Sequence, residues 1–399
     1  MPAAANGGHT FIPIIVARGS EVSWAQVGSL DIPPSMPRDS QPHHQTLAGA
    51  GSATITRMTI RYPTPLRPGD RVGVTSPSSG VDARMWPRLE AALATVRERG
   101  YEVVLGACMS GEGHVSAPAA ERAAELTSML LDPTIRAIVP PWGGETAIDL
   151  LPLLDWAAIE AAEPTWVIGY SDISTIITPL TLRTGVATVH GNNLMDTPYV
   201  PPPGLLGWLD LGTARVGAVL IQSSPGRYRA AGHDDYVATP WVDRMSLDAV
   251  GTWTRLDDAA PVDVFGRLIG GCIETLSHVA GTAYGDIPRW VATHAPEGTI
   301  VYVEAAEDDA YATCRALHGM RLAGFFAGAN AVLVGRTHAP DGPTLTQREA
   351  VLDALGCLGV PILADVECGH VAPFLGLVNG ALARVEHGPQ TARITQSLT

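Results

Sequence analysis

The chain has 399 residues, of which 46% are hydrophobic and 17% charged, a length for which we expect two globular domains rather than one core. The formal net charge of −14 opposes a phosphate backbone and no basic run occurs, so nucleic acid is excluded as an expected partner. No apolar stretch approaches the roughly 20 residues of a transmembrane helix, which also excludes a membrane partner.

The first half of the chain alternates between strand and helix patterns. Residues 1–57 are rich in Gly, Ala, Pro, Ser and His and predict a poorly ordered extension. After it we expect strands at 71–75, 102–105, 135–139, 165–169 and 185–189, alternating with helices at 86–99, 118–131, 150–162 and 173–182. This alternation predicts a parallel sheet with covering helices, and we assign it to a domain of residues 58–199.

The second half begins with an irregular segment. Residues 200–261 contain a Pro-Pro-Pro-Gly run and scattered tryptophans, which we interpret as a linker with an inserted loop that faces the substrate. A second α/β domain is predicted over 262–399. It begins at 266–272 and continues with strands at 299–303, 331–334 and 360–364, the last as the closing strand, and with helices at 273–279, 311–323 and 344–356.

The stretch 165–174 combines the features of a strand, a sharp turn and a helix. Its apolar run ends at Gly169, Ser171 follows two residues later, and a helical segment begins at once. A serine at such a turn exposes its hydroxyl at a sheet end, with the N–H of Asp172 available to an oxyanion. Ser and Asp also favour helix caps, and on this stretch alone the cap is the commoner outcome.

Two further segments belong to the same neighbourhood. Gly143 and Gly144 follow a buried strand and could supply a second oxyanion donor, although a simple tight turn explains them equally well. A loop containing His190 and Asn192 follows the strand predicted at 185–189. We expect this loop to lie beside Ser171.

Three candidate catalytic residues occupy equivalent places in the pattern. Ser171, Glu304 and His370 each lie at or just beyond the C-terminal end of an apolar strand, the edge where open α/β sheets bind ligands. They supply a nucleophile, a base and a carboxylate that orients the base. Individually, His370 could be one surface histidine among 12, and Glu304 has acidic neighbours that could take its role.

The ordered set of these motifs resembles the LD-carboxypeptidase family of serine peptidases, which includes the microcin C self-immunity enzymes. The resemblance covers roughly residues 60–385 and rests on the segments 66–70, 140–145, 169–172, 190–191, 266–271 and 304–370. It implies two domains: an N-terminal flavodoxin-like or Rossmann-like parallel sheet that carries Ser171, and a C-terminal α/β domain of the swivelling type that carries Glu304 and His370. The site would lie at their junction.

The resemblance also implies residue roles. Ser171 would be the nucleophile, His370 the general acid and base, and Glu304 its orienting partner. The N–H of Asp172 and that of Gly143 or Gly144 would form the oxyanion hole. The long insertion with its tryptophans, and the endings at 270–272 and 366–370, are closer to the microcin C immunity branch.

Enzymes of that branch cleave the amide between an aspartyl carboxyl and a nucleotide-like group, and they stack the base on an aromatic ring. Trp241 is the candidate for that stacking, and His190, Asn192 and Glu307 complete the predicted substrate contacts. The neutral pair at 305–306 departs from the more polar sequence of many relatives, which leaves the substrate contacts open.

Two other functions remain open. One is an LD-carboxypeptidase that trims muropeptides during cell-wall recycling, and the other is a non-catalytic protein that binds a small ligand. The five cysteines are widely spaced and lack a Cys-x-x-Cys pair, so we expect neither disulfides nor a cysteine zinc site, and we expect a cytoplasmic protein. We further expect no cofactor, no metal, a small-molecule or short-peptide substrate, and a homodimer.

Overall fold

The computed structural model describes residues 58–257 and 260–399. The extension predicted at 1–57 lies outside the described residues. All described residues belong to one compact unit of the chain, Thr54–Thr399. Among its described helices, none is both long and apolar enough to cross a membrane.

The N-terminal sheet is parallel except at one edge, and its six strands run in the order β14-β5-β4-β3-β1-β2. The parallel strands are β1 (Arg71–Val74), β2 (Glu102–Leu105), β3 (Ile135–Ile138), β4 (Trp166–Gly169) and β5 (Thr188–His190). Their order, 2-1-3-4-5, is that of flavodoxin-like sheets, so the predicted fold class is confirmed. The sixth strand, β14 (Leu377–Asn379), comes from the other end of the chain and pairs antiparallel with β5.

The elements of this half follow the apolar periodicity, with one exception among the helices and one among the strands. The helices are α1 (Trp86–Glu98), α2 (Ala119–Leu131), α3 (Trp156–Ala161) and α4 (Ser174–Thr184), with the 3-10 turns η1 (Ala83–Met85), η2 (Ala147–Leu150), η3 (Ser171–Ile173) and η4 (Leu194–Asp196). The single helix predicted at 150–162 is wrong. Pro152 removes a backbone donor, and the Asp155 side chain caps a new helix by accepting from the N–H of Ala158. The strand predicted at 185–189 begins later, because Gly185 ends α4 with φ 66°.

The C-terminal sheet has eight strands in the order β6-β16-β15-β10-β11-β12-β13-β9. Its parallel centre is β10 (Val262–Cys272), β11 (Thr299–Glu304), β12 (Ala329–Gly335) and β13 (Ile362–Val366). The antiparallel edges are β6 (Val219–Ser223), β9 (Thr254–Arg255), β15 (Leu382–Gly388) and β16 (Thr391–Ser397). The prediction of a closing strand at 360–364 is therefore wrong, since β14, β15 and β16 follow β13.

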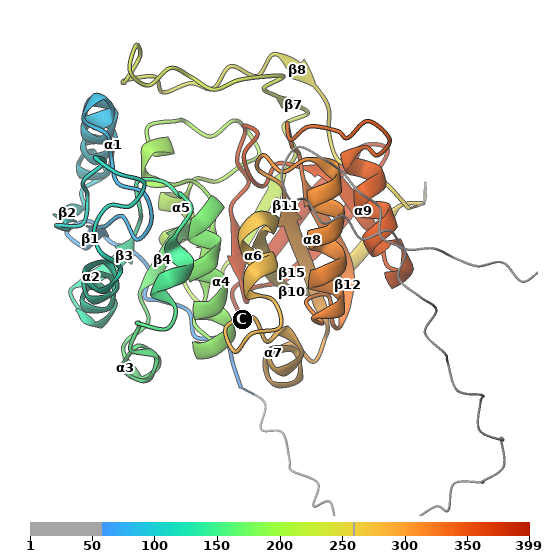
Figure 1. The fold of residues 1–399 in the computed structure, drawn as a ribbon, viewed down its shortest axis with the longest axis horizontal. Coiled ribbons are helices and arrows are strands. Elements are labelled where there is room, and N and C mark those ends of the chain that lie inside the picture. Colours follow the sequence, from blue (N-terminus) through green and yellow to red (C-terminus); the bar gives the residue numbers. More distant parts are fainter. Residues whose placement is uncertain (1–57, 258–259) are drawn as a thin grey trace, which may run out of the picture. The chain divides into compact units, whose positions relative to one another are not determined.

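The helices of this half are α5 (Trp208–Gly212), α6 (Ile273–Val279), α7 (Ile287–His294), α8 (Ala310–Leu322) and α9 (Gln347–Leu355), with the turn η5 (Gly356–Leu358). A small two-stranded sheet, β7 (Arg227–Tyr228) with β8 (Ala249–Val250), interrupts the long segment between the large sheets (Figure 1). The predicted domain boundaries at 199/200 and 261/262 stay a prediction. The segment between them is not wholly irregular, because α5 and β6 lie within it.

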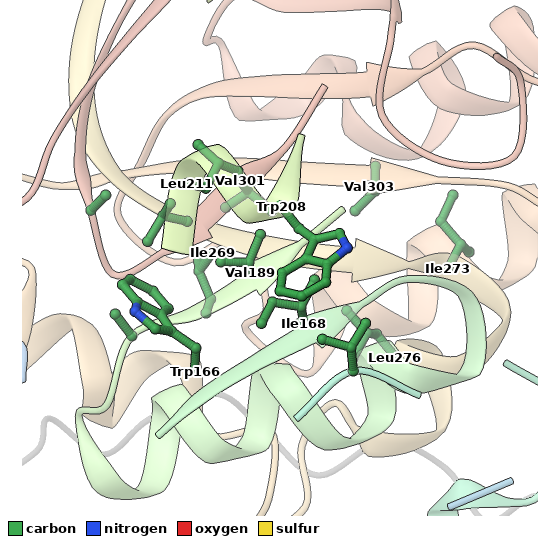
Figure 2. Close-up of a cluster of buried hydrophobic side chains, with 14 of the residues drawn as sticks. Trp166, Ile168, Val189, Trp208, Leu211, Ile269, Ile273, Leu276, Val301 and Val303 are labelled. Atoms are coloured by element: carbon green, nitrogen blue, oxygen red, sulfur yellow. The ribbon is translucent and has the colours of Figure 1, made fainter. Parts of the chain in front are cut away.

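One buried cluster joins the two large sheets (Figure 2). The side chains labelled there are at most 2% exposed and come from strands of both sheets and from two helices: Trp166 and Ile168 (β4), Val189 (β5), Ile269 (β10), Val301 and Val303 (β11), Trp208 and Leu211 (α5), and Ile273 and Leu276 (α6). Helix α4 also packs against α6 and β10. Burying each large apolar side chain contributes about 1.5–3 kcal/mol. The cluster therefore fixes the end of β4 relative to the end of β11.

Candidate active site

Ser171 lies in a strained turn at the end of β4. Its φ of 62° is left-handed, a conformation that costs a non-glycine residue roughly 1–3 kcal/mol. The turn is tight at Gly169, where a Cβ would lie 2.7 Å from Asn193 Oδ1. Ser171 is not a helix cap, because Tyr170 occupies the capping position of η3 without a side-chain hydrogen bond. Its hydroxyl is thus left available to a partner outside the turn.

The buried Asp172 carboxylate stabilises this turn through hydrogen bonds. It is 2% exposed, and its Oδ2 accepts from Ser78 Oγ at 2.6 Å and from the N–H of Ala147 at 2.8 Å, while Oδ1 accepts from Thr175 Oγ1 at 3.1 Å. Burial raises the pKa of this carboxyl, although the three hydrogen bonds oppose the rise. The backbone N–H of Asp172 donates to no group in the described part of the chain.

The structure brings together Ser171, Glu304 and His370. His370 Nε2 lies 3.0 Å from Ser171 Oγ, and His370 Nδ1 lies 2.7 Å from Glu304 Oε2. Ser171 follows β4, Glu304 is the last residue of β11, and His370 follows β13, so each comes from the C-terminal end of a parallel strand. Three segments distant in sequence thus form one continuous hydrogen-bonded chain.

The electrostatics of this chain favour an ion pair between imidazole and carboxylate. Burial works to raise the pKa of Glu304, but His370 and His190 outweigh it and lower the pKa to about 2. Burial works to lower the pKa of His370, but the Glu304 carboxylate outweighs it and raises that pKa above its usual value. A carboxylate with this partner stabilises the imidazolium that forms when the imidazole takes a proton.

A second histidine lies behind the Glu304 carboxylate. His190 ends β5, is 1% exposed, and its Nε2 lies 3.8 Å from Glu304 Oε1. Neither of these two atoms has a hydrogen-bond partner among the described residues. The Tyr302 ring packs on the His190 imidazole at a centroid distance of 5.1 Å. His190 therefore lies on the buried side of the carboxylate.

The two predicted glycines differ in position. A Cβ on Gly143 would lie 2.8 Å from Ser171 Cβ and 2.9 Å from the Asp172 nitrogen, so only glycine fits beside the serine. Gly144 has φ 144°, and a Cβ there would meet the hydroxyls of Ser78 and Ser79 instead. The geometry favours Gly143 as the neighbour of the Ser171 hydroxyl.

A cavity of about 240 Å³ opens beside His370. Aromatic rings line much of it: Trp142, Tyr170, Tyr199, Tyr236 and Phe374. Its charged and titratable lining side chains are Asp196, Arg229, His233, Asp234, His338 and His370. Four of the lining residues in these two sets belong to the irregular segment 200–261, namely Arg229, His233, Asp234 and Tyr236. The sequence pattern predicts none of the four as site residues, because the segment has no helical or strand period to place them.

The four predicted substrate contacts do not line this cavity. Trp241 is 65% exposed, and the carbonyls on either side of it, of Pro240 and Val242, accept from Arg88 Nη1. Asn192 is buried, whereas its neighbour Asn193 lines the cavity. Glu307 lies in an exposed loop, and its N–H donates to Glu274 Oε1. His190, the fourth, lies behind Glu304.

A group of side chains with metal-ligating atoms lies on α8 and α9. Atoms of Cys314, His318 and Asp353 lie within 4.8 Å of one another. The spacing rule for cysteine pairs misses such a group because its members come from two helices. Arg321 donates to His318 Nδ1 at 3.2 Å, which leaves the ring proton on Nε2, and this N–H donates to Asp353 Oδ2 at 2.9 Å. These hydrogen bonds account for the arrangement.

Comparison with protein families gives two matches, in chain order. Residues 72–191 match the LD-carboxypeptidase N-terminal domain, and residues 265–385 match the LD-carboxypeptidase C-terminal domain. The first match contains Ser171, and the second contains Glu304 and His370. Together the two matches extend over more than half of the chain.

Individual relatives carry two kinds of name. The microcin C7 self-immunity protein MccF of Escherichia coli is 24% identical over 352 residues, which cover 83% of this chain and 95% of that protein. The murein tetrapeptide carboxypeptidase of Pseudomonas aeruginosa is 27% identical over 248 residues, which cover 62% of this chain and 70% of that protein. A solved structure of a MccF point mutant in complex with adenosine monophosphate has a TM-score of 0.70 at 22% identity, covering 84% of this chain and 98% of that one. At that identity the likeness shows a shared two-domain fold.

Proposed function

Because this chain belongs to the LD-carboxypeptidase family, we propose that Ser171, His370 and Glu304 are the catalytic triad with which it hydrolyses a carboxamide through an acyl-enzyme. Membership makes the chain a serine-type carboxypeptidase, a hydrolase. The observation that carries the triad is the hydrogen-bonded chain from Ser171 Oγ through both nitrogens of His370 to Glu304 Oε2. That order of groups is what nucleophilic activation of a serine requires.

In the first half-reaction, His370 Nε2 takes the Ser171 proton as Oγ attacks the substrate carbonyl carbon. The buried Glu304 carboxylate holds the Nδ1 proton and stabilises the imidazolium. The tetrahedral intermediate then collapses, and the C–N bond breaks as His370 returns the proton to the leaving amine. The acyl group remains on Ser171 as an ester.

The oxyanion of that intermediate needs donors beside Ser171. The N–H of Asp172 makes no hydrogen bond to the described residues, and Gly143 packs against the Ser171 side chain. We assign the oxyanion hole to the N–H groups of Asp172 and Gly143, while Gly144 is turned toward the serine loop 78–79.

In the second half-reaction, water replaces the amine. His370 Nε2 takes a proton from the water as its oxygen attacks the ester, and the proton then passes to Ser171 Oγ as the ester bond breaks. The products are a free carboxylate and a regenerated serine. His370 must be neutral at the start of each half-reaction, which couples turnover to its pKa.

For the substrate, the cavity favours a peptide with a free C-terminal carboxylate. The permanent positive charge of Arg229 lines the cavity that also contains His370. The amide before such a terminal residue would lie at Ser171, as in a carboxypeptidase. An LD-linked muropeptide is a substrate of this chemical class.

A second substrate class is supported by the aromatic lining. Tyr199, Tyr236 and Trp142 present rings on which a nucleobase could stack, as an aminoacyl-nucleotide amide requires. Trp241, the ring expected for this purpose, is exposed outside the cavity. For an aminoacyl-nucleotide substrate, we therefore assign the stacking of the base to the rings within the cavity.

Mass spectrometry of reaction products separates the two classes. The full chain and its Ser171→Ala variant are incubated with an LD-linked tetrapeptide and, separately, with aspartyl sulfamoyl adenosine. Release of the terminal amino acid from the tetrapeptide, lost in the variant, supports the carboxypeptidase assignment. Turnover of the nucleotide alone would assign the second class, and equal turnover by Ser171→Ala would contradict the serine mechanism.

A further inference from the structure

A carboxypeptidase must distinguish the terminal carboxylate of its substrate from an amide within the chain. A buried cation is the usual means, because a charged hydrogen bond to a carboxylate is about twice as strong as a neutral one. Arg229 is the only lysine or arginine among the described residues that line the cavity. Arg229 is only 7% exposed, so its charge is largely shielded from solvent.

Arg229 is held rigidly by contacts that leave part of its guanidinium unused. Its backbone N–H donates to the carbonyl of Ala372 at 3.0 Å, two residues beyond His370. Nε donates to the carbonyl of Ser246 at 3.3 Å, and Nη2 donates to Asp234 Oδ2 at 2.6 Å. Nη1 has no hydrogen-bond acceptor within range among the described residues, although the Tyr199 hydroxyl also interacts with the guanidinium. The arginine is therefore attached to the segment that carries His370 and retains donors for a ligand.

Asp234 orients the guanidinium, and Tyr199 in turn orients Asp234. The Tyr199 hydroxyl donates to the same oxygen, Oδ2, that accepts from Arg229. Burial works to raise the pKa of Asp234, but the bonds from Arg229 and Tyr199 outweigh it and keep this pKa below its usual value. The Asp234 carboxylate stays ionised at neutral pH and fixes the plane of the guanidinium.

The neighbouring His233 does not supply a comparable charge. Burial, followed by the positive charges of Arg229 and of nearby histidines, lowers its pKa below the usual value, so its imidazole is neutral at pH 7. An arginine remains charged at any pH at which the enzyme folds. The permanent cation of the cavity is therefore Arg229.

We propose that Arg229 is the specificity residue that binds the terminal carboxylate of the substrate, through Nη1 and the remaining Nη2 proton, while Asp234 and Tyr199 hold it in position. This inference rests on the proposed function, because it places the scissile amide at Ser171. The ligand class is a peptide with a free α-carboxylate, and a terminal carboxamide lacks the charge that the guanidinium recognises.

The test compares an LD-linked tetrapeptide with the same peptide ending in a carboxamide. We expect Arg229→Gln to lower kcat/KM for the acid by about 10- to 100-fold and to change kcat/KM for the amide by less than about threefold. Arg229→Lys should recover part of the loss, since lysine restores the positive charge but not the planar guanidinium that binds a carboxylate through two hydrogen bonds. The matched control is Arg227→Gln, two residues away on β7, which does not line the cavity and whose side chain donates to the Leu247 carbonyl.

Equilibrium binding separates this inference from the proposed function. In a Ser171→Ala background, calorimetry measures the affinities for the acid and the amide without any turnover. A preference for the acid that disappears with Arg229→Gln supports Arg229 as the residue that binds the terminal carboxylate, even if the wild type cleaves neither peptide. Equal losses for acid and amide, or an unchanged preference, would overturn it. Unchanged thermal unfolding of Arg229→Gln shows that the variant folds.

Discussion

The two sides of the cavity are built in different ways. On one side lies His370, which together with Ser171 and Glu304 extends from the ends of parallel strands that a buried cluster joins (Figure 2). On the other side, Arg229 and Asp234 come from a long segment in which the nearest regular structure along the chain is the two-residue strand β7. Positions on the sheet ends fix reacting atoms to fractions of an ångström, whereas an irregular segment adapts the recognition of substrate. Changes on the first side should therefore impair the chemistry, and changes on the second should alter selectivity.

The largest effect is expected at Glu304. Glu304→Gln removes the charge that raises the pKa of His370, and we expect kcat to fall by about 10³- to 10⁴-fold. Glu274 and Asp196 still act to raise the pKa of His370, but the largest charge that opposes burial is gone, so this pKa falls. Because His370 works as a neutral base, the residual activity should persist to lower pH than in the wild type. Glu90→Gln on the exposed face of α1 is the control, and an unchanged acidic limb in Glu304→Gln would contradict this coupling.

Gly143→Ala should rank second. Its Cβ would lie 2.8 Å from Ser171 Cβ and 2.9 Å from the Asp172 nitrogen, so the turn must shift. We expect kcat to fall by about 10²- to 10³-fold with little change in KM, since the oxyanion donors are displaced. Gly319→Ala in α8 is the matched control, because a Cβ there meets nothing within 4 Å and alanine favours a helix. Full activity of Gly143→Ala would remove this glycine from the oxyanion hole.

Substitutions at His190 test how the buried side of the Glu304 carboxylate affects catalysis. His190→Leu leaves Glu304 Oε1 buried without a neighbouring donor, and we expect kcat to fall by about 10-fold and the pKa of Glu304 to rise. His190→Gln retains a donor and should recover part of the rate. If the two variants lose activity equally, His190 serves packing alone. Steady-state kinetics across pH make the comparison.

Trp241 should show the smallest effect. Its ring is 65% exposed and does not line the cavity, so Trp241→Ala should change kcat/KM on the tetrapeptide by less than about twofold. The same variant assayed on aspartyl sulfamoyl adenosine sharpens the comparison. A selective loss on the nucleotide would restore the expectation that this ring stacks on a base.

Much of the fold follows from local sequence patterns. Short apolar runs predict β1 to β4 and β11 to β13, and apolar spacing predicts most of the helices, because parallel strands with buried faces carry a strong signal. The break between η2 and α3 depended on the capping bond of Asp155, which competes with a continuous helix. The hairpin of β15 and β16 was missed because its exposed face dilutes the apolar run.

The candidate site likewise contains residues that local sequence patterns predict and residues that only tertiary contacts place. Ser171, Glu304 and His370 could be grouped from sequence because strand ends of parallel sheets share one edge. Their roles, like the homodimer and the cytoplasmic location, stay predictions. Arg229 and Asp234 could not be found, since their placement depends on tertiary hydrogen bonds such as the one to the carbonyl of Ala372. The sequence does not show on which side of Glu304 His190 lies, and its role in binding substrate stays a prediction.

The central claim is that Ser171 is a nucleophile activated by His370. The most direct test is labelling of the full chain with a fluorophosphonate, followed by peptide mapping by mass spectrometry. The account predicts one label per chain, on Ser171, at a rate at least about 10²-fold slower in His370→Gln. A label on another residue, or an equal rate of labelling in His370→Gln, would contradict it.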